Sequence, residues 1–379
     1  MSPFPRRFSR RGFLATGLSG VALASAAPAL AELRIDVGQG FVSPLPIAIP
    51  DFQSLDGGGG RIGADVASVV TADLERSGLF RPLPPSSFIQ DSTSLQQNVR
   101  FGDWRLINAD ALVVGYVKTA PDGRIVVGFR LYDVYGERQQ TGFEYATSPA
   151  NWRKVAHTVA DEIYASITGE GKYFDTRIVY VAESGPKDRR VKRLAIMDQD
   201  GANVSYLTDG QTMALTPRFS PNGDLVTYMN FAEGNPQVYL LQLSTGQQQR
   251  LANVGAMTFA PRFSPDGGTV AFSVEQGGST NLYAISTGGG QPLQLTSGAA
   301  IDTSPSYSAD GSRIIFESDR GGSPQIYMMG AGGGNAQRIS FGQGSYSTPV
   351  WSPNGDLIAF TRQSGGQFHI GIMNPDGSG

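Results

Sequence analysis

The sequence repeats one short turn at a fixed interval of 44 residues. Its four copies read PRFSPNG, PRFSPDG, PSYSADG and PVWSPNG, at residues 217–223, 261–267, 305–311 and 349–355. Proline suits the first central position of a β-turn, and glycine tolerates the positive φ that follows, so each copy predicts a corner between two strands. An even period of this length indicates a repeat architecture.

Aromatic residues recur at matching places around each corner. The strand before each corner carries Phe219, Phe263, Tyr307 or Trp351. The strand after it carries Tyr228, Phe272, Phe316 or Phe360. A third strand carries Tyr239, Tyr283 or Tyr327. A fourth segment ends in YLT, RLA, QLT or RIS. Four strands in one period make a propeller blade. Because stacked blades bury each other's faces, we predict that these aromatics are core residues between neighbouring blades.

The number of repeats predicts an incomplete ring. An earlier copy of the unit begins near residues 176–181 (TRIVYV) and carries a short insertion, GPKDRR. Counting from there, we expect a β-propeller over residues 173–379 that holds about four and a half blades and is incomplete at its C-terminal end. A sixth blade at the observed period would need roughly sixty more residues, so we expect the sequence to be a fragment.

The part of the chain between residues 32 and 170 predicts a small α/β domain. Apolar residues at helical spacing predict one helix over residues 61–77 and a second that opens at Ser148 and Pro149. Residues 46–52 predict a short apolar strand, and two β-rich runs joined by APDG predict a hairpin.

A glycine motif in this domain raises the possibility of a nucleotide cofactor. Gly58, Gly60 and Gly63 satisfy the dinucleotide-binding pattern G-x-G-x-x-G. The glycines begin six residues beyond the end of the strand at Phe52, and no acidic residue follows where a ribose partner is expected. We therefore favour a flexible loop and expect no cofactor.

The N-terminus predicts export from the cytoplasm. A basic region leads into an apolar run that ends in Ala-Leu-Ala, so residues 1–31 read as a signal peptide with the mature chain starting at Glu32. The stretch SRRGFL resembles the twin-arginine export motif, and an ordinary secretory signal is the alternative. Either route, together with the absence of cysteine, fits a periplasmic protein.

The composition offers little material for catalysis. The chain has no cysteine and only two histidines, His157 and His369, which fall in different predicted domains. No nucleophile elbow occurs, and DQDG at residues 198–201 lacks the spaced acids of a calcium loop, so a hairpin turn is preferred. The net charge of −3 includes no basic block outside the signal peptide, which argues against nucleic acid or an anionic membrane surface as partner. We expect a monomeric, non-catalytic binding protein without a metal.

Several runs of sequence resemble the TolB family, the soluble periplasmic proteins of the Tol–Pal system. They read PLPIAIPDF, ADLERSGLFRPL, DALVVGYV and HTVADEIYASITGEGKYFDTRIVYV, and the blade motifs add to them. The resemblance implies an α/β domain followed by a six-bladed propeller. It also implies binding to the peptidoglycan-associated lipoprotein Pal and to the inner-membrane protein TolA, in support of outer-membrane invagination during division and outer-membrane integrity. The sequence departs from the family in lacking a C-terminal blade, and in Gly371 where a third-strand tyrosine is expected.

The mature N-terminus is the candidate TolA-binding segment. It comprises Glu32, Leu33, Arg34, Ile35, Asp36 and Val37. Its alternating apolar residues could add as a strand to the sheet edge of a partner. The resemblance implies that TolA binds through this segment. The alternative is that the segment pairs with its own domain, and a switch between the two states would suit a regulated contact.

The stretches just before each corner are the candidate Pal-binding surface. Residues 256–260, 300–304 and 345–348 are small, polar and varied, unlike the repeated core, and they enter the innermost strands from one face of the ring. By resemblance, Met257, Ala260 and Thr303 fall on the surface that contacts Pal. The alternative is that they are plain loops between blades.

Two enzymatic alternatives remain. The repeats could form the propeller half of a prolyl-oligopeptidase-like peptidase whose catalytic domain is missing, or a propeller hydrolase that uses carboxylates in its channel. Propellers host enzymes and binding proteins alike, so the fold does not decide between them.

Overall fold

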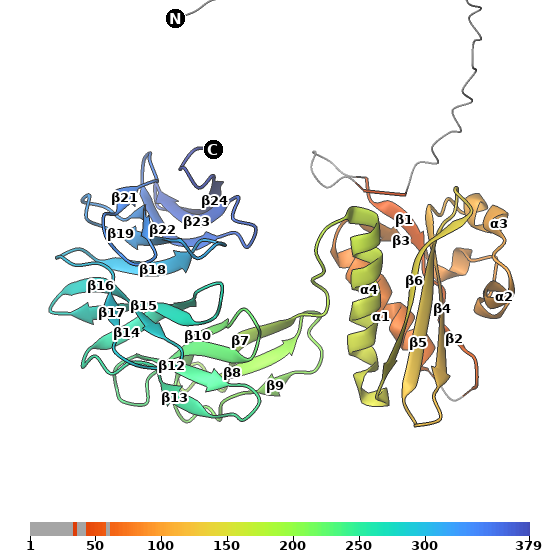
Figure 1. Ribbon diagram of the computed structural model, residues 1–379, viewed down its shortest axis with the longest axis horizontal. Coiled ribbons are helices and arrows are strands. Elements are labelled where there is room, and N and C mark those ends of the chain that lie inside the picture. The colour runs from red at the N-terminus through yellow and green to blue at the C-terminus, as the bar shows by residue number, and fades with distance from the viewer. Residues whose placement is uncertain (1–32, 36–42, 58–60) are drawn as a thin grey trace, which may run out of the picture. The chain divides into compact units, whose positions relative to one another are not determined.

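The structure is a computed structural model that describes residues 33–35, 43–57 and 61–379 (Figure 1). The expected signal peptide lies outside the described residues, as do Glu32, Asp36 and Val37 of the candidate TolA-binding segment and Gly58 and Gly60 of the glycine motif. The chain divides into two compact units, and the second begins at Tyr173 and runs to Gly379.

The first unit is built on one mixed sheet of six strands: β1 (Leu45–Ala48), β2 (Gln53–Ser54), β3 (Phe80–Pro82), β4 (Ala111–Thr119), β5 (Ile125–Asp133) and β6 (Arg138–Thr147). The main path runs β3-β1-β4-β5-β6, and β2 also pairs with β4. Strand β1 runs parallel to β3 and β4, whereas β4, β5 and β6 form an antiparallel meander. The predicted hairpin is therefore the β4–β5 pair.

Helices cover this sheet. They are α1 (Ile62–Arg76), α2 (Ser92–Gln97), α3 (Phe101–Leu106) and α4 (Trp152–Thr168), with 3-10 turns η1 (Pro85–Ser87) and η2 (Pro149–Asn151). Helices α1 and α4 pack against each other on one side of the sheet, and α2 and α3 lie on the other side (Figure 1). The predicted face of α4 is buried at Val155, Val159, Ile163 and Ile167, which explains its helical spacing of apolar residues.

The third glycine of the motif has a packing role. Gly63 lies in the first turn of α1, and an added Cβ would sit 2.0 Å from the carbonyl oxygen of Phe52. The N–H of Phe52 also donates to the Gly63 carbonyl oxygen at 3.3 Å. Glycine is required here because the first turn of the helix approaches the backbone at Phe52, just before β2, too closely for any side chain.

The second unit consists of five antiparallel sheets in chain order. Their strands are β7 (Arg177–Ser184), β8 (Val191–Asp198) and β9 (Ser205–Tyr206); β10 (Ala214–Phe219), β11 (Leu225–Asn230), β12 (Gln237–Gln242) and β13 (Gln248–Arg250); β14 (Met257–Phe263), β15 (Thr269–Gln276), β16 (Ser279–Ser286) and β17 (Leu293–Gln294); β18 (Asp302–Tyr307), β19 (Arg313–Ser318), β20 (Gln325–Gly330) and β21 (Gln337–Arg338); and β22 (Ser345–Trp351), β23 (Ile358–Ser364) and β24 (Gln367–Met373).

These sheets are the blades of a partial propeller. Each connects its strands in sequence, and the first strands β10, β14, β18 and β22 lie side by side, each contacting the next (Figure 1). The three middle sheets have four strands, and the first and last sheets have three among the described residues. The insertion GPKDRR lies between β7 and β8, so β7 matches the second strand of the repeated unit.

The repeated corners form the expected turns. In each, the glycine N–H donates to the serine carbonyl oxygen three residues earlier at 2.9 Å, as in Gly267 to Ser264 and Gly311 to Ser308. The four corner glycines have φ between 71° and 80°, a range that residues with a Cβ rarely adopt.

Clusters of buried side chains join consecutive blades. Val238 of β12 packs in one cluster with Phe272 of β15, and Leu282 of β16 packs in the next with Phe316 of β19. Tyr228, Phe272 and Phe316 are fully buried. The prediction that the aromatics after each corner fill the gaps between blades is thus confirmed for these three.

Gly371 explains the one break in the aromatic series. In the preceding blades, the ring after the corner packs against the third-strand tyrosine, with centroids 6.2 Å apart for Phe272 and Tyr283. In the last blade, an added Cβ at Gly371 would sit 2.5 Å from the Phe360 ring. Phe360 packs against Tyr346 instead, with centroids 5.3 Å apart.

Candidate functional site

The described part of the N-terminal segment docks on the end of α4. The N–H of Ile35 donates to the carbonyl oxygen of Ile167 at 2.9 Å, and the Ile35 side chain is buried. The Gln140 side-chain amide bridges the two elements, donating to the carbonyl oxygens of Leu33 at 3.2 Å and Ser166 at 3.0 Å. Carbonyl groups in the last turn of a helix lack partners within the helix, and the segment satisfies two of them with Gln140.

Arg34 strengthens this contact electrostatically. An added Cβ at Gly169, the residue that ends α4, would lie 3.0 Å from the Arg34 guanidinium. A cation close to a helix C-terminus is favoured by the helix dipole, although solvent exposure of Arg34 limits the effect. A pocket of about 320 Å³ adjoins the segment and is lined by Arg34, Ile35 and Asp110, whose pKa is raised by burial.

Of the two alternatives for the segment, the described residues adopt the intramolecular one. Leu33, Arg34 and Ile35 lie together against the end of α4, while the remaining three predicted residues lie outside the described part of the chain. The segment pairs with a helix end rather than with a strand, which alternation alone did not indicate.

The three candidate Pal-contacting residues lie on neighbouring innermost strands. Met257 and Ala260 belong to β14, and Thr303 belongs to β18, which contacts β14. All three are partly buried. The Thr303 hydroxyl accepts a hydrogen bond from Ser273 at 3.2 Å, so its position is fixed by the adjacent strand β15.

Each innermost strand carries a left-handed residue that was not predicted. Thr216, Ala260, Ser304 and Thr348 have φ of 49°, 52°, 55° and 47°, and each directly precedes the proline of its corner motif. The strand register shifts at the same place in all four blades. Positive φ costs free energy in non-glycine residues, and such strain concentrates at binding and active sites. Ala260, one of the candidate residues, is a member of this set.

In the sequence, the only sign of these left-handed residues and register shifts was that each residue precedes the proline of a corner that recurs four times. The local rule points elsewhere, because a residue before proline favours extended backbone. The pairing between the first and second strands of each blade overrides that preference.

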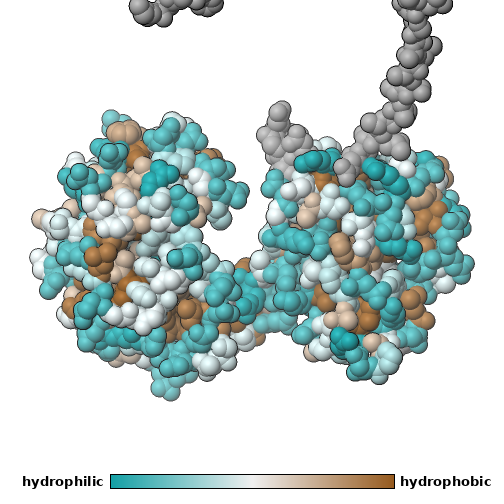
Figure 2. Space-filling model, viewed as in Figure 1, coloured by the Kyte–Doolittle hydropathy of each residue, from teal (hydrophilic) through white to brown (hydrophobic). Residues whose placement is uncertain are grey.

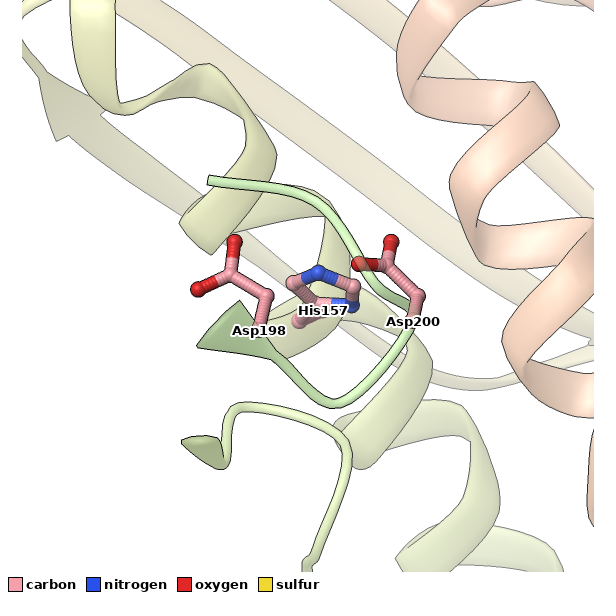
Figure 3. Close-up of side chains that lie close together, drawn as sticks. All are labelled: His157, Asp198 and Asp200. Atoms are coloured by element: carbon pink, nitrogen blue, oxygen red, sulfur yellow. The ribbon is translucent and has the colours of Figure 1, made fainter. Parts of the chain in front are cut away.

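The two histidines have different surroundings. His157 of α4 is buried, and its Nδ1 lies 2.6 Å from Asp73 Oδ2 of α1, a pairing within the first unit. His369 lies on β24 and is exposed. Asp198 ends β8, and Asp200 lies in the turn that follows, where the Gly201 N–H donates to the Asp198 carbonyl oxygen at 2.9 Å (Figure 3). The DQDG stretch is therefore a hairpin turn, as predicted.

Metal-ligating side chains do not gather within either unit among the described residues. Figure 3 draws His157 with Asp198 and Asp200, but the histidine belongs to the first unit and both aspartates to the second. No group of three ligating side chains forms inside one unit in the described ranges.

Comparison with known proteins identifies the family. The family model described as the TolB beta propeller domain matches residues 164–379, and the TolB amino-terminal domain matches residues 33–140. The chain belongs to the TolB family. The fold of this family explains the arrangement seen here, in which an N-terminal domain precedes a β-propeller.

Relatives support the assignment. The chain is 56% identical over 236 residues to a Tol-Pal system protein TolB from Paramagnetospirillum magneticum, a match that covers 62% of this chain and 53% of the relative. The chain thus spans about half the length of that curated relative. The crystal structure of TolB from Acinetobacter baumannii is similar with a TM-score of 0.77 at 28% identity, covering 90% of this chain and 83% of the other.

The face drawn in Figure 2 is a mixture of hydrophilic areas and apolar patches. Within the described ranges, no helix has the length and apolar character needed to cross a membrane.

Proposed function

We propose that this chain acts in the Tol–Pal system as a non-catalytic periplasmic protein that binds Pal through its propeller and TolA through its N-terminal segment. In this role it supports outer-membrane invagination during division and outer-membrane integrity. The observation that carries the proposal is the succession of the TolB amino-terminal domain and the TolB propeller in one chain. The relative from P. magneticum, which carries the name of the Tol-Pal system, supports it further.

The strained innermost strands support a Pal contact at the start of β14 and β18, residues 256–260 and 300–304, which we call the mouth of the propeller. Backbone strain persists only where surrounding structure holds it, and here the pairing of each innermost strand holds four left-handed residues in place. Met257, Ala260 and Thr303 lie on two such strands. A surface held this rigidly loses little conformational entropy when a partner binds.

Purified Pal tests this contact. We expect Met257→Arg and Thr303→Arg to weaken Pal binding in a titration by at least about tenfold, since a buried unpaired charge in an interface is costly. Gln337→Arg, on the exposed outermost strand β21, is the matched control and should bind like the parent chain. If the folded protein ignored Pal at tens of micromolar, or if all three variants bound Pal equally, the assigned surface would be wrong.

The few contacts of the N-terminal segment support a detachable TolA site. One backbone hydrogen bond and one buried side chain, both at Ile35, hold the described residues together with Gln140. Binding to TolA as an added strand would use the same backbone groups, so the docked and TolA-bound states exclude each other.

Deletion of residues 32–37 tests the TolA contact. We expect the shortened protein to lose TolA capture while its circular dichroism spectrum stays unchanged, because the segment contributes no strand or helix of the described fold. Unchanged capture would place the TolA contact elsewhere in the chain.

A six-bladed ring is part of the proposal. Ile370 of β24 is 82% exposed, whereas Ile326, Leu282 and Val238 at the same place in the preceding blades are fully buried. Each of those residues is covered by the next blade. A further blade that covers β24 would bury this face in the same way.

Absence of catalysis is also part of the proposal. Among the described residues, His157 pairs with Asp73 in the interior of the first unit, and His369 stands exposed on a strand. Neither arrangement activates a nucleophile. Incubation of the protein with peptide and glycan libraries should yield no turnover, and reproducible cleavage would favour one of the hydrolase alternatives.

A further inference from the structure

Two arginines occupy equivalent places on neighbouring innermost strands. The residue that follows the proline of each corner motif is Arg218 in β10, Arg262 in β14, Ser306 in β18 and Val350 in β22. The two arginines and Ser306 line one pocket of about 340 Å³, formed where the corners of four blades converge. The pocket is large enough for a small ligand.

Neither arginine has a carboxylate partner in the part of the chain that the structure describes. Arg262 Nη1 donates to the carbonyl oxygen of Pro261 at 3.2 Å, and no ion pair involves either side chain within those residues. Arg262 is partly buried, and Arg218 is open to solvent from the pocket. Two like charges therefore line the same open pocket without a carboxylate to compensate them.

The electrostatics of the pair follow from this arrangement. Burial, together with the charge of Arg218, lowers the pKa of Arg262 to about 10, and burial lowers the pKa of Arg218. Both guanidinium groups remain protonated at neutral pH. A partly buried cation without a partner is costly, and an anion held between the two would remove that cost.

Neighbouring serines add hydrogen-bond donors. The Ser306 hydroxyl oxygen accepts from the Trp351 N–H at 3.0 Å, and its own hydrogen has no acceptor among the described residues. Ser264 and Ser308 differ, because their hydroxyl groups donate to Asp266 and Asp310 of their own corners. One hydroxyl group is thus available beside the arginines.

We propose that this pocket binds a small oxyanion, a free dicarboxylate or inorganic phosphate, between Arg218 and Arg262, with the Ser306 hydroxyl as a further donor. Planar guanidinium groups match the oxygen spacing of carboxylates and phosphates and bind them through paired hydrogen bonds. The site uses none of the residues assigned to the proposed Pal and TolA contacts, although Arg262 shares β14 with Met257 and Ala260.

Isothermal titration calorimetry on the full chain tests the site. Malonate and inorganic phosphate are titrated separately near neutral pH and at low salt, where charge interactions are least screened. We expect saturable binding at one site for at least one of the two anions, and the tighter of the two identifies the preferred class.

Variants assign the binding to the pair. Arg262→Gln should weaken the anion at least about tenfold, because a charge-assisted bond to a partly enclosed ligand is lost. Arg218→Gln should weaken it less, since Arg218 is more open to solvent. Arg262→Lys, which keeps the charge but not the planar fork, should fall between the parent and Arg262→Gln.

Arg189→Gln is the matched control, because Arg189 is 83% exposed in the insertion between β7 and β8 and its loss removes the same charge. It should bind the anion like the parent chain. As a second readout, phosphate or malonate should raise the melting temperature of the parent chain and of Arg189→Gln but not of Arg262→Gln.

Three outcomes would overturn the proposal. The first is no saturable heat up to about 10 mM of either anion. The second is equal affinity in the parent chain and Arg262→Gln. The third is that an acidic peptide, titrated in parallel, binds while neither small anion does, which would replace the small anion by a protein partner.

Discussion

The two candidate partner surfaces are built on opposite principles. The N-terminal segment is held on the end of α4 by the Ile35 backbone bond, the buried Ile35 side chain and the Gln140 bridge. The mouth of the propeller is held by the innermost strands β10, β14, β18 and β22, each of which pairs with the next strand of its blade, and fully buried aromatics back them. Under the proposed function, the first surface detaches to bind TolA, whereas the second is held in place by strand pairing before Pal binds. A single chain can therefore offer one regulated contact and one constant contact.

The largest predicted effect concerns the support of the preformed surface. Phe316→Ala should lower the free energy of unfolding of the second unit by about 3–5 kcal/mol, because it leaves a cavity between two blades. Denaturant titration gives this free energy when the unfolding transition of the second unit is resolved from that of the first.

Phe368→Ala is the matched control, since Phe368 is 70% exposed on β24, and it should change the stability by no more than about 0.5 kcal/mol. Similar losses in the two variants would show that the gaps between blades do not carry the stability of the propeller.

A smaller effect is predicted for the detachable surface. Ile35→Ala removes the buried side chain of the segment, but the cost cannot exceed the free energy of undocking, because the rest of the unit stays folded when the segment leaves. We expect a loss of about 1 kcal/mol or less, with the segment becoming a preferred site of limited proteolysis.

Leu33→Ala is the control for this variant. The backbone carbonyl of Leu33 accepts the hydrogen bond from Gln140, and alanine keeps that carbonyl, so the segment should stay docked. A global loss in Ile35→Ala as large as that of Phe316→Ala would contradict the view of the segment as detachable.

The repeat made the buried aromatics of the propeller predictable, but it did not predict the backbone conformation of the innermost strands. The aromatics Tyr228, Phe272 and Phe316 were predictable because one spacing places them at one structural position. The left-handed backbone at Ala260 and Thr348 was not, since the local preference before proline is extended and only strand pairing reverses it. The partner of Ile35 was equally hidden, because alternation fits a strand edge and a helix end alike.

The strain itself can be measured at Thr216, which has φ of 49° and is exposed. Thr216→Asn should raise the stability of the second unit by about 0.5–1 kcal/mol, because asparagine tolerates the left-handed region better than a β-branched residue.

Thr212→Asn, four residues earlier and without positive φ, should bring no such gain. A destabilised Thr216→Asn variant would mean that the threonine side chain, rather than its backbone, is what the innermost strand needs.

The smallest predicted effects are two pH dependences of opposite sign, one at Glu317, which pairs with Thr303, and one at Asp310, in the corner that follows β18. Burial, with Asp319 nearby, raises the pKa of Glu317, although the Thr348 N–H bond to it works against this. The charged form is therefore disfavoured in the folded state, and stability falls as pH rises from about 4.5 toward neutral. Glu317→Gln should melt at a higher temperature than the parent chain near neutral pH and equally below pH 4.5.

Asp310 provides the opposite case. Hydrogen bonds from Ser308 and Ser312 lower its pKa to about 2, so its contribution to stability is present above its ordinary value of 3.8 and is lost as pH falls through about 2. Asp310→Asn should therefore melt at a lower temperature at neutral pH, and the difference should shrink in acid. Parallel pH profiles for the two variants would contradict these assignments.

Hydrogen exchange in the presence of purified Pal tests the central claim most directly. We predict that Pal slows exchange in peptides that cover residues 256–260 and 300–304, at the start of β14 and β18, while the outermost strands β13, β17 and β21 exchange as before. Protection of the outermost strands with unchanged exchange at residues 256–260 would contradict the account, because the preformed mouth would then not be the surface that Pal binds.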